Sequence, residues 1–196
     1  KTELQRLSQD LAKQFKQGKS MKIPVGDHVG NRVTLSCGSS TELTSIGDAE
    51  MDMVVTDPPF SELVQYSELS DFFYVWLAPV LRDKYPEVFG GSYTPKALEA
   101  VENPYRQGAD AKAFYQRILT DCWREAYRIL KPGGLLAFTF HHSEDGPSVQ
   151  VLESLFSAGF YLEATYPIRG DESKGDAQFG SMKVEYDIIH VCRKRI

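Results

Sequence analysis

The sequence of 196 residues has few cysteines, no long apolar run and no excess of basic residues. Cys37, Cys122 and Cys192 lie far apart and form no Cys-x-x-Cys pair, which argues against a disulfide framework and a zinc cage. We expect each to be a small buried residue. The apolar run Leu135 to Phe140 is far shorter than the roughly 20 residues that a membrane span needs. These absences favour a cytoplasmic protein with no membrane partner.

The charge is slightly acidic, with 22 Lys and Arg against 27 Asp and Glu and a net charge of −5. A non-specific polyanion binder is usually basic, so any contact with nucleic acid must be local or assisted by another part of the molecule. The length and the 42% hydrophobic content suit one ordinary domain. The chain begins with Lys1 and shows no signal peptide, so we expect it to be a piece of something longer.

Strand patterns alternate with helix patterns along the chain. Strands are predicted at 32–36, 51–56, 135–140, 161–166 and 184–192, and helices at 2–17, 62–82, 110–130 and 147–158. This alternation predicts an α/β fold with a mostly parallel, doubly wound, Rossmann-like sheet. The segment 167–183 is too short for a crossover helix, so the last two strands should pair antiparallel. We expect an N-terminal helix and linker over 1–32 and the sheet domain over 33–196.

Two of these helices have a marked apolar stripe. The first stripe comprises Leu69, Phe72, Phe73, Trp76 and Val80. The second comprises Phe114, Ile118, Cys122, Ala126 and Ile129, widened by Tyr115, Leu119, Trp123 and Tyr127. Between the two helices, residues 84–108 predict an irregular stretch with one short helix near 96–101, and such stretches often cover sites.

The tetrapeptide Asp57-Pro58-Pro59-Phe60 follows a buried strand at the sheet edge where α/β proteins bind ligands. Each proline fixes φ near −65°, removes a backbone N–H and forces its predecessor out of the helical region. The result is a stiff loop with two acceptors, the Asp57 carboxylate and the Pro58 carbonyl. Such a pair suits the two coplanar N–H groups of an amine on an aromatic ring. A plain turn after a strand is the alternative interpretation.

The chemistry of such a pocket follows from its acceptors. Asp57 would orient the amine, stabilise the positive charge that develops on nitrogen and take the proton late. Phe60 offers a face for the flat ring, and Tyr66 either lines the same pocket or belongs to the core. His141 and His142 follow the next buried strand. Because they are adjacent and point to opposite faces, they cannot easily share a metal, and we expect one to pack inside and one to line the cleft.

Asp57 to Phe60 resembles the catalytic motif of amino-methyltransferases that use S-adenosylmethionine. The wider segments Thr56 to Leu77, Arg128 to His142 and Tyr186 to Arg195 resemble the large adenine-specific DNA methylases that contain a zinc-ribbon insertion. The resemblance covers most of residues 33–195. It implies methyl transfer from S-adenosylmethionine to the exocyclic amine of an adenine flipped out of DNA.

The resemblance also implies roles for single residues. Asp57 and Pro58 would bind the target amino group, with Pro59 shaping the loop and Phe60 stacking on the base. Gly38 and Ser39 would contact the cofactor adenine, together with Asp57 in the cofactor site. In the family a Gly-Asp pair is common at Gly38-Ser39, so Ser39 weakens a side-chain contact to the adenine amine. The implied fold is a seven-stranded sheet whose last strand is antiparallel.

The family has a glycine-rich cofactor loop and an acidic ribose-binding residue ahead of these motifs, and no Gly-x-Gly precedes residue 33. The first two strands are therefore expected to be missing. The chain resembles the C-terminal part of the catalytic domain, with the N-terminal half of the same protein as its expected partner and with activity in doubt for this part alone. The same chemistry on RNA guanine or on a protein amide, and a non-catalytic scaffold, remain alternative functions.

Overall fold

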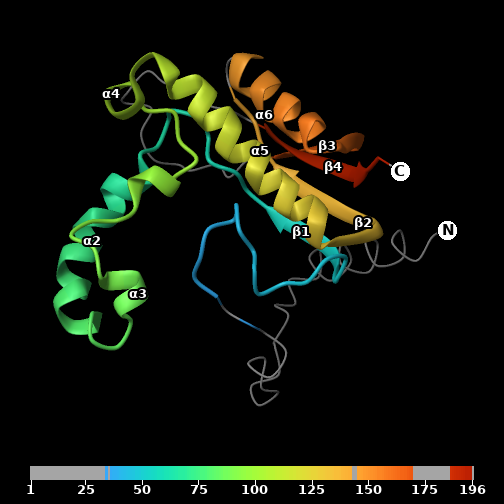
Figure 1. The fold of residues 1–196 in the computed structure, drawn as a ribbon. Helices are drawn as coiled ribbons and strands as arrows, with labels where there is room; N and C mark the ends of the chain where they lie inside the picture. The colour runs from blue at the N-terminus through green and yellow to red at the C-terminus, as the bar shows by residue number, and fades with distance from the viewer. Residues whose placement is uncertain (1–33, 35, 143–144, 170–185, 196) are drawn as a thin grey trace, which may run out of the picture. The chain divides into compact units, whose positions relative to one another are not determined.

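The computed structural model describes residues 34, 36–142, 145–169 and 186–195 (Figure 1). All its helices and strands belong to one compact unit, Cys37–Ile196. The helix expected at 2–17 lies outside the described residues. So does most of the strand expected at 32–36, whose described members Thr34 and Ser36 have no regular structure.

The described strands form one mixed sheet in the order β1-β2-β4-β3. Their bounds are Met51–Thr56 for β1, Leu130–Thr139 for β2, Phe160–Arg169 for β3 and Tyr186–Lys194 for β4. β1 pairs parallel with β2, while β4 runs antiparallel to both β2 and β3. The α/β class, the parallel pairing and the antiparallel final pair are confirmed.

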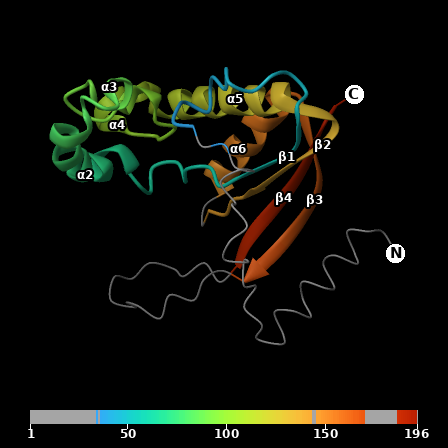
Figure 2. The same ribbon diagram turned by 90° about the horizontal axis from the view of Figure 1, so that it is seen from below.

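One face of the sheet carries the hydrophobic core. Helices α5 (Ala111–Ile129) and α6 (Asp145–Ser157) lie side by side on this face (Figures 1 and 2). Their buried residues pack against β2, β3 and β4 through side chains that include Tyr115, Leu119, Trp123, Val151, Leu155, Phe138 and Phe160. On the other face of β1, Met53 and Val55 are exposed. Within the described ranges, α5 and α6 cover one side of the sheet, and these residues show no helix on its other side (Figure 2).

A helical excursion separates β1 from α5 and projects away from the strands (Figure 2). It contains α2 (Tyr66–Leu81), α3 (Pro86–Phe89), the 3-10 turns η2 (Lys96–Leu98) and η3 (Gly108–Asp110), and α4 (Pro104–Gln107). Pro104 occupies the first turn of α4, and the Asn103 side chain accepts a hydrogen bond from the Arg106 backbone N–H. The stretch 84–108 is thus more helical than its sequence predicts.

The structure corrects several details of the sequence interpretation. β2 begins at Leu130, because Lys131-Pro132-Gly133-Gly134 forms an irregularity within the strand and does not separate it from α5. The buried face of α5 combines members of both expected stripes: Tyr115, Leu119 and Trp123 of the widening stripe and Ala126 and Ile129 of the main stripe. Phe114, Ile118 and Cys122 of the main stripe are only half-buried. Cys37 is exposed and Cys122 half-buried, and only Cys192 is buried as expected.

Glycine ends α6 for a steric reason. Gly159 has a φ of +98°, and a Cβ there would lie 3.1 Å from the Tyr127 ring. No helix among the described residues is long and apolar enough to cross a membrane.

Candidate functional site

The Asp57 corner, defined here as residues 57–61, follows β1 at the carboxyl edge of the sheet. β2 ends beside it, since Thr56 and Phe138 are partners in the parallel ladder. Asp57 is exposed, Pro58 is buried, and Pro59 and Phe60 are half-buried. The prolines have no N–H and cannot extend the ladder, which explains why β1 stops here. The corner therefore presents a solvent-accessible carboxylate next to a buried proline.

Thr139, the last residue of β2, holds the Asp57 carboxylate. Its Oγ1 donates a hydrogen bond of 2.8 Å to Asp57 Oδ1. Within the part of the chain that the structure describes, neither Asp57 Oδ2 nor the Pro58 carbonyl accepts a hydrogen bond. One carboxylate oxygen is thus fixed, and two acceptors remain for a ligand.

Tyr115 of α5 anchors the second proline. Its hydroxyl donates a hydrogen bond of 2.7 Å to the Pro59 carbonyl, and the whole side chain is buried. Burial raises the pKa of Tyr115 to about 12, so the hydroxyl remains a donor at any physiological pH. The two prolines have no N–H donor and can be fixed only through their carbonyls. The Pro59 carbonyl accepts from Tyr115 and also from the Ser61 N–H, at 3.1 Å.

Ser61 closes the corner in a conformation that is uncommon for a residue other than glycine. Its φ is +48°, and it is almost fully buried. Its hydroxyl donates to Glu102 Oε2 at 3.1 Å, while the Glu102 N–H donates to the Ser61 carbonyl at 3.3 Å. These contacts hold the left-handed turn in place, and such strain often accompanies functional loops.

Phe60 lies against the core. Its ring stacks on Phe140 with centroids 5.3 Å apart and an interplanar angle of 15°. Because Phe140 is buried, one face of the Phe60 ring is already covered. Only the opposite face could receive a flat ring.

Tyr66, at the start of α2, lies close enough to the corner for the charge of Asp57 to affect its pKa. Partial burial raises the pKa of Tyr66, the negative charges of Asp57 and Glu99 raise it further, and a hydrogen bond with the Phe60 backbone opposes them. The side chain remains 40% exposed. The structure therefore brings Tyr66 to the Asp57 corner, as expected of a pocket residue.

A polar network ties the first turn of α2 to the segment before α5. Ser67 donates to Glu99 through both its backbone N–H, at 2.8 Å, and its hydroxyl, at 2.5 Å. Arg106 forms an ion pair of 2.8 Å with the same carboxylate and a hydrogen bond of 2.9 Å with Gln65. Burial opposes ionisation of Glu99, but the Ser67 and Arg106 contacts outweigh it and lower the pKa of the carboxyl group. The network fixes the chain directly after the corner.

His141 and His142 follow β2 at the same edge of the sheet as Asp57. Both are half-buried, so neither is packed fully inside, as was expected of one of them. Their position at this edge agrees with that of cleft residues, and their role in substrate binding stays a prediction.

Gly38 and Ser39 show no preformed cofactor cradle. A Cβ at Gly38 would meet nothing within 4 Å, and the Ser39 hydroxyl is 2.7 Å from that of Thr41. The loop that follows is held at the C-terminal end of α5, where Arg128 donates to the Leu43 carbonyl. No described contact brings this loop to the Asp57 corner, so a cofactor role for Gly38 and Ser39 remains a prediction.

A hollow elsewhere in the molecule does not coincide with the corner. It is lined by Thr41, Glu42, Asp121, Arg124 and Glu125. Its carboxylates are partly neutralised, since Asp121 pairs with Arg124 and Glu125 with Arg128. It offers no planar acceptor pair.

Sequence reasoning missed the residues that support the corner: Thr139, Tyr115, Ser61, Glu102 and Phe140. For Thr139 a signal was available, because it ends the strand adjacent to the Asp57 strand and carries a short donor. Phe140 follows Thr139 at the same strand end, whereas Tyr115 and Glu102 reach the corner only because the excursion 62–110 folds back, which local patterns do not reveal.

Comparison with known proteins gives a distant likeness. No protein-family model matches the chain, and no curated protein matches it. Among solved structures, TTHA0409 of Thermus thermophilus, assigned as a DNA modification methylase, has 19% identity and a TM-score of 0.44 over 80% of this chain. Its complex with S-adenosyl-L-methionine gives 19% identity and a TM-score of 0.43.

A protein of Thermoplasma acidophilum assigned as a methyltransferase has 15% identity and a TM-score of 0.27, covering 76% of this chain and 70% of its own. The chain spans about half the length of TTHA0409, 50% in one structure and 51% in its complex.

Proposed function

We propose that this chain carries the amine-binding part of an S-adenosylmethionine-dependent methyltransferase that acts on the exocyclic amino group of adenine in DNA. One observation carries the proposal. An exposed carboxylate and a backbone carbonyl, each with acceptor capacity that no described residue uses, sit on a proline-stiffened corner that is fixed by Thr139 and Tyr115. This arrangement suits an amine with two coplanar N–H donors.

The roles of the residues follow from their geometry. Asp57 Oδ2 and the Pro58 carbonyl accept the two amine hydrogens and direct the nitrogen lone pair away from the corner. Tyr66 and the open face of Phe60 border the same space and offer contacts to the flat ring. As the new C–N bond forms, the Asp57 carboxylate stabilises the charge on nitrogen and accepts the released proton.

S-adenosylmethionine, when bound, supplies a methyl group on a sulfonium, and the electron pair of the broken C–S bond stays on sulfur. The described residues fit the amine well but show no cradle for this cofactor. We propose that Gly38, Ser39 and Asp57 contact it and that the N-terminal half of the same protein supplies the remaining contacts.

DNA is the proposed macromolecular partner, and the cytoplasm is the proposed location. A net charge of −5 gives the chain little attraction for a polyanion. We therefore place most of the affinity for DNA outside this chain. His141 and His142 are proposed to border the base from the end of β2.

The test is transfer of a labelled methyl group from S-adenosylmethionine to DNA by this chain together with the N-terminal half that completes the proposed cofactor site, followed by digestion to nucleosides. We expect label in N6-methyldeoxyadenosine, lost in Asp57→Ala and retained in Asp52→Ala. Asp52 is a matched control, because it is an exposed aspartate at the other end of β1.

Three other outcomes would contradict the proposal. Label in RNA guanine or in a protein amide would assign the same corner to a different amine. Absence of both label and cofactor binding by calorimetry when the N-terminal half is present would assign the chain to a non-catalytic, scaffolding role. Retained transfer in Asp57→Ala would remove the corner from the reaction.

A further inference from the structure

Helix α2 has two faces of opposite character. Its inner face holds the buried residues Ser67, Tyr74 and Ala78. The outer face presents an apolar stripe, defined here as Leu69, Phe72, Phe73, Trp76 and Val80, whose exposed fractions run from 62% to 78%. The stripe lies opposite the buried face, because its members recur at helical spacing half a turn away from Tyr74 and Ala78. The expected shared face is confirmed, but it does not face the core.

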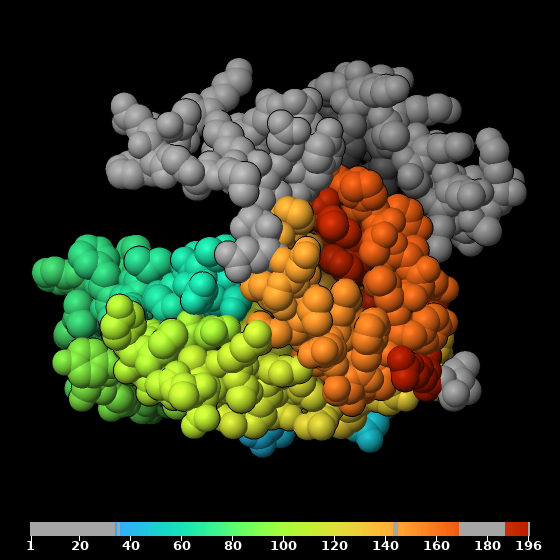
Figure 3. Space-filling model, turned by 90° about the horizontal axis from the view of Figure 1, so that it is seen from above, coloured from blue at the N-terminus to red at the C-terminus, as the bar shows by residue number. Residues whose placement is uncertain are grey.

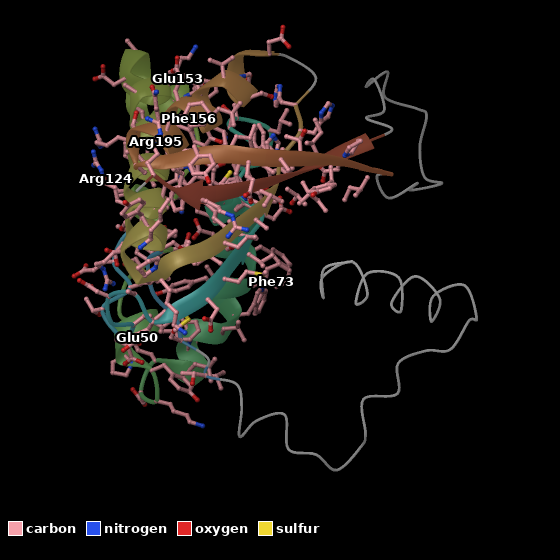
Figure 4. The ribbon with its side chains drawn as sticks, turned by 90° about the vertical axis from the view of Figure 1, so that its right-hand side faces the viewer. Glu50, Phe73, Arg124, Glu153, Phe156 and Arg195 are labelled. Carbon is pink, nitrogen blue, oxygen red and sulfur yellow. The ribbon has the colours of Figure 1, made fainter. Side chains whose placement is uncertain are left out.

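Rotation of the helix cannot hide this stripe, because polar contacts fix the inner face. The Tyr74 hydroxyl donates to the Gly91 carbonyl at 2.9 Å, and Asp71 accepts the Thr94 N–H at 2.9 Å. In the space-filling view, α2 forms one end of the described surface, away from the orange residues of α6 and β3 (Figure 3). The Phe73 ring and Arg124 of α5 lie on opposite sides of the molecule in Figure 4. The stripe is therefore open to a partner.

The chemistry of the stripe excludes several kinds of occupant. It is the convex surface of a helix, whereas small molecules occupy concave pockets. No Lys or Arg occurs between Asp57 and Leu81, while Glu62 and Glu68 are acidic and Asp71 is paired with Lys96, so the stripe has no cation that would attract nucleic acid or anionic lipid. Exposed aromatic side chains in a contiguous patch are typical of protein interfaces.

The stripe has the same order of residue types in both directions, so two copies placed antiparallel bring like residue types together. Aliphatic Leu69 and Val80 lie at its ends, and the aromatic residues Phe72, Phe73 and Trp76 lie between them. The two ends of α2 also differ in charge: Glu62 and Glu68 stand near its start, and Arg82 and Lys84 flank Asp83 after its end. The Arg82 guanidinium donates to the Phe89 and Gly91 carbonyls. An antiparallel pair of α2 helices joins aliphatic to aliphatic, aromatic to aromatic and acidic to basic ends, and also opposes the helix dipoles. A parallel pair would bring like charges together.

We propose that α2 is a dimerisation helix, which pairs antiparallel with α2 of a second copy of this chain across a two-fold axis near Phe73 and Trp76. Three aromatic side chains, each about two-thirds exposed, would bury roughly 300–500 Å² per copy. With Leu69 and Val80 the interface approaches, but does not reach, the ~800 Å² per partner of a standard interface. The dimer is therefore weak, with a Kd of about 1–100 µM.

Sedimentation equilibrium of the full chain from about 1 to 200 µM tests the association, because this range brackets the expected Kd. The mass should rise from one chain to two with concentration. Trp76→Glu and Phe73→Glu should remain monomeric throughout, with unchanged circular dichroism because both side chains are exposed. Val149→Glu is the matched control: it puts the same charge on a 50% exposed apolar residue of α6 and should still dimerise. A monomeric wild type, or a Trp76→Glu variant that dimerises like wild type, would overturn the proposal.

The orientation has its own measurement. A spin label at Asp83→Cys, in a Cys37→Ser background that removes the exposed thiol, reports the distance between copies. Antiparallel pairing about the proposed axis places the labels about 25–30 Å apart, as the rise per residue requires. A separation under about 15 Å would show parallel pairing and contradict the proposed arrangement.

Discussion

The Thr139 hydroxyl donates a hydrogen bond of 2.8 Å to the Asp57 carboxylate across the parallel strands β1 and β2. The two residues are far apart in the sequence and become neighbours only because both strands end at the same edge. Among the described residues, this bond engages Asp57 Oδ1 and leaves Oδ2 as the oxygen that we propose binds the amine.

Thr139→Val should lower methyl transfer about tenfold, because a hydrogen bond to a charged group contributes about 1.5–3 kcal/mol and the unanchored carboxylate orients the amine less well. Thr139→Ser keeps the donor and should retain most of the activity. The measurement is kcat and KM for DNA under saturating S-adenosylmethionine. Equal losses in the two variants would show that Thr139 acts through packing and not through its hydroxyl.

Tyr115→Phe should reduce the free energy of unfolding by about 0.5–1.5 kcal/mol, because the Pro59 carbonyl loses its Tyr115 donor inside the core but keeps the Ser61 N–H. Chemical denaturation measures this loss. Tyr127→Phe removes a hydroxyl from the same helix, where it donates to the Arg195 carbonyl at an exposed position, and should cost little. A Tyr115→Phe variant as stable as wild type would show that another donor replaces the hydroxyl.

The free energy of unfolding should decrease as the pH is lowered from 7 to 5, because His190 takes up a proton. Its ring is half-buried, with Phe138 stacked 4.8 Å away, and this burial lowers the pKa of His190, opposed by the Ile188 backbone and the charge of Asp187. The unfolded chain, with an ordinary pKa near 6.5, then binds the proton more tightly than the folded chain. The contribution of neutral His190 to the free energy of unfolding is complete above about pH 6.5 and is lost as the pH falls below this value.

The check is the free energy of unfolding of wild type and His190→Phe at several pH values. The His190 contribution to the slope should not exceed about 1.4 kcal/mol per pH unit, since one proton is involved, and the variant should lose it. Asp71 and Glu125, both with a pKa lowered to about 2, act only in more acid solution, below their usual values. An identical slope in wild type and variant would refute the assignment to His190.

Arg128→Lys should loosen the loop before β1. The guanidinium donates to the Leu43 and Ile46 carbonyls and pairs with Asp48 and Glu125, a fork that one ammonium group cannot reproduce. Hydrogen exchange of the Leu43 and Ile46 amides should become faster, while that of the α5 core stays unchanged. Arg124→Lys is the control, since its exposed pair with Asp121 fixes no loop.

Much of the fold and part of the site followed from local patterns. β1 was predicted with its observed bounds, because an apolar β-branched run stops where two prolines remove the ladder donors. The final pair was predicted antiparallel, since the connection is too short for a crossover helix. The residues that hold the corner in place were not predicted, because Tyr115 and Glu102 reach it only when the excursion 62–110 folds back.

By itself, the sequence determined the alternation of strands and helices and the chemistry of the Asp57-Pro58 corner, because periodicity and proline geometry are local properties. The tertiary structure alone decided which side of each amphipathic helix is buried. α2 has its larger apolar stripe outside, because hydrogen bonds and ion pairs to residues 91–106 hold its other face. It also decided which oxygen of Asp57 a described residue engages, because that depends on where the neighbouring strand ends.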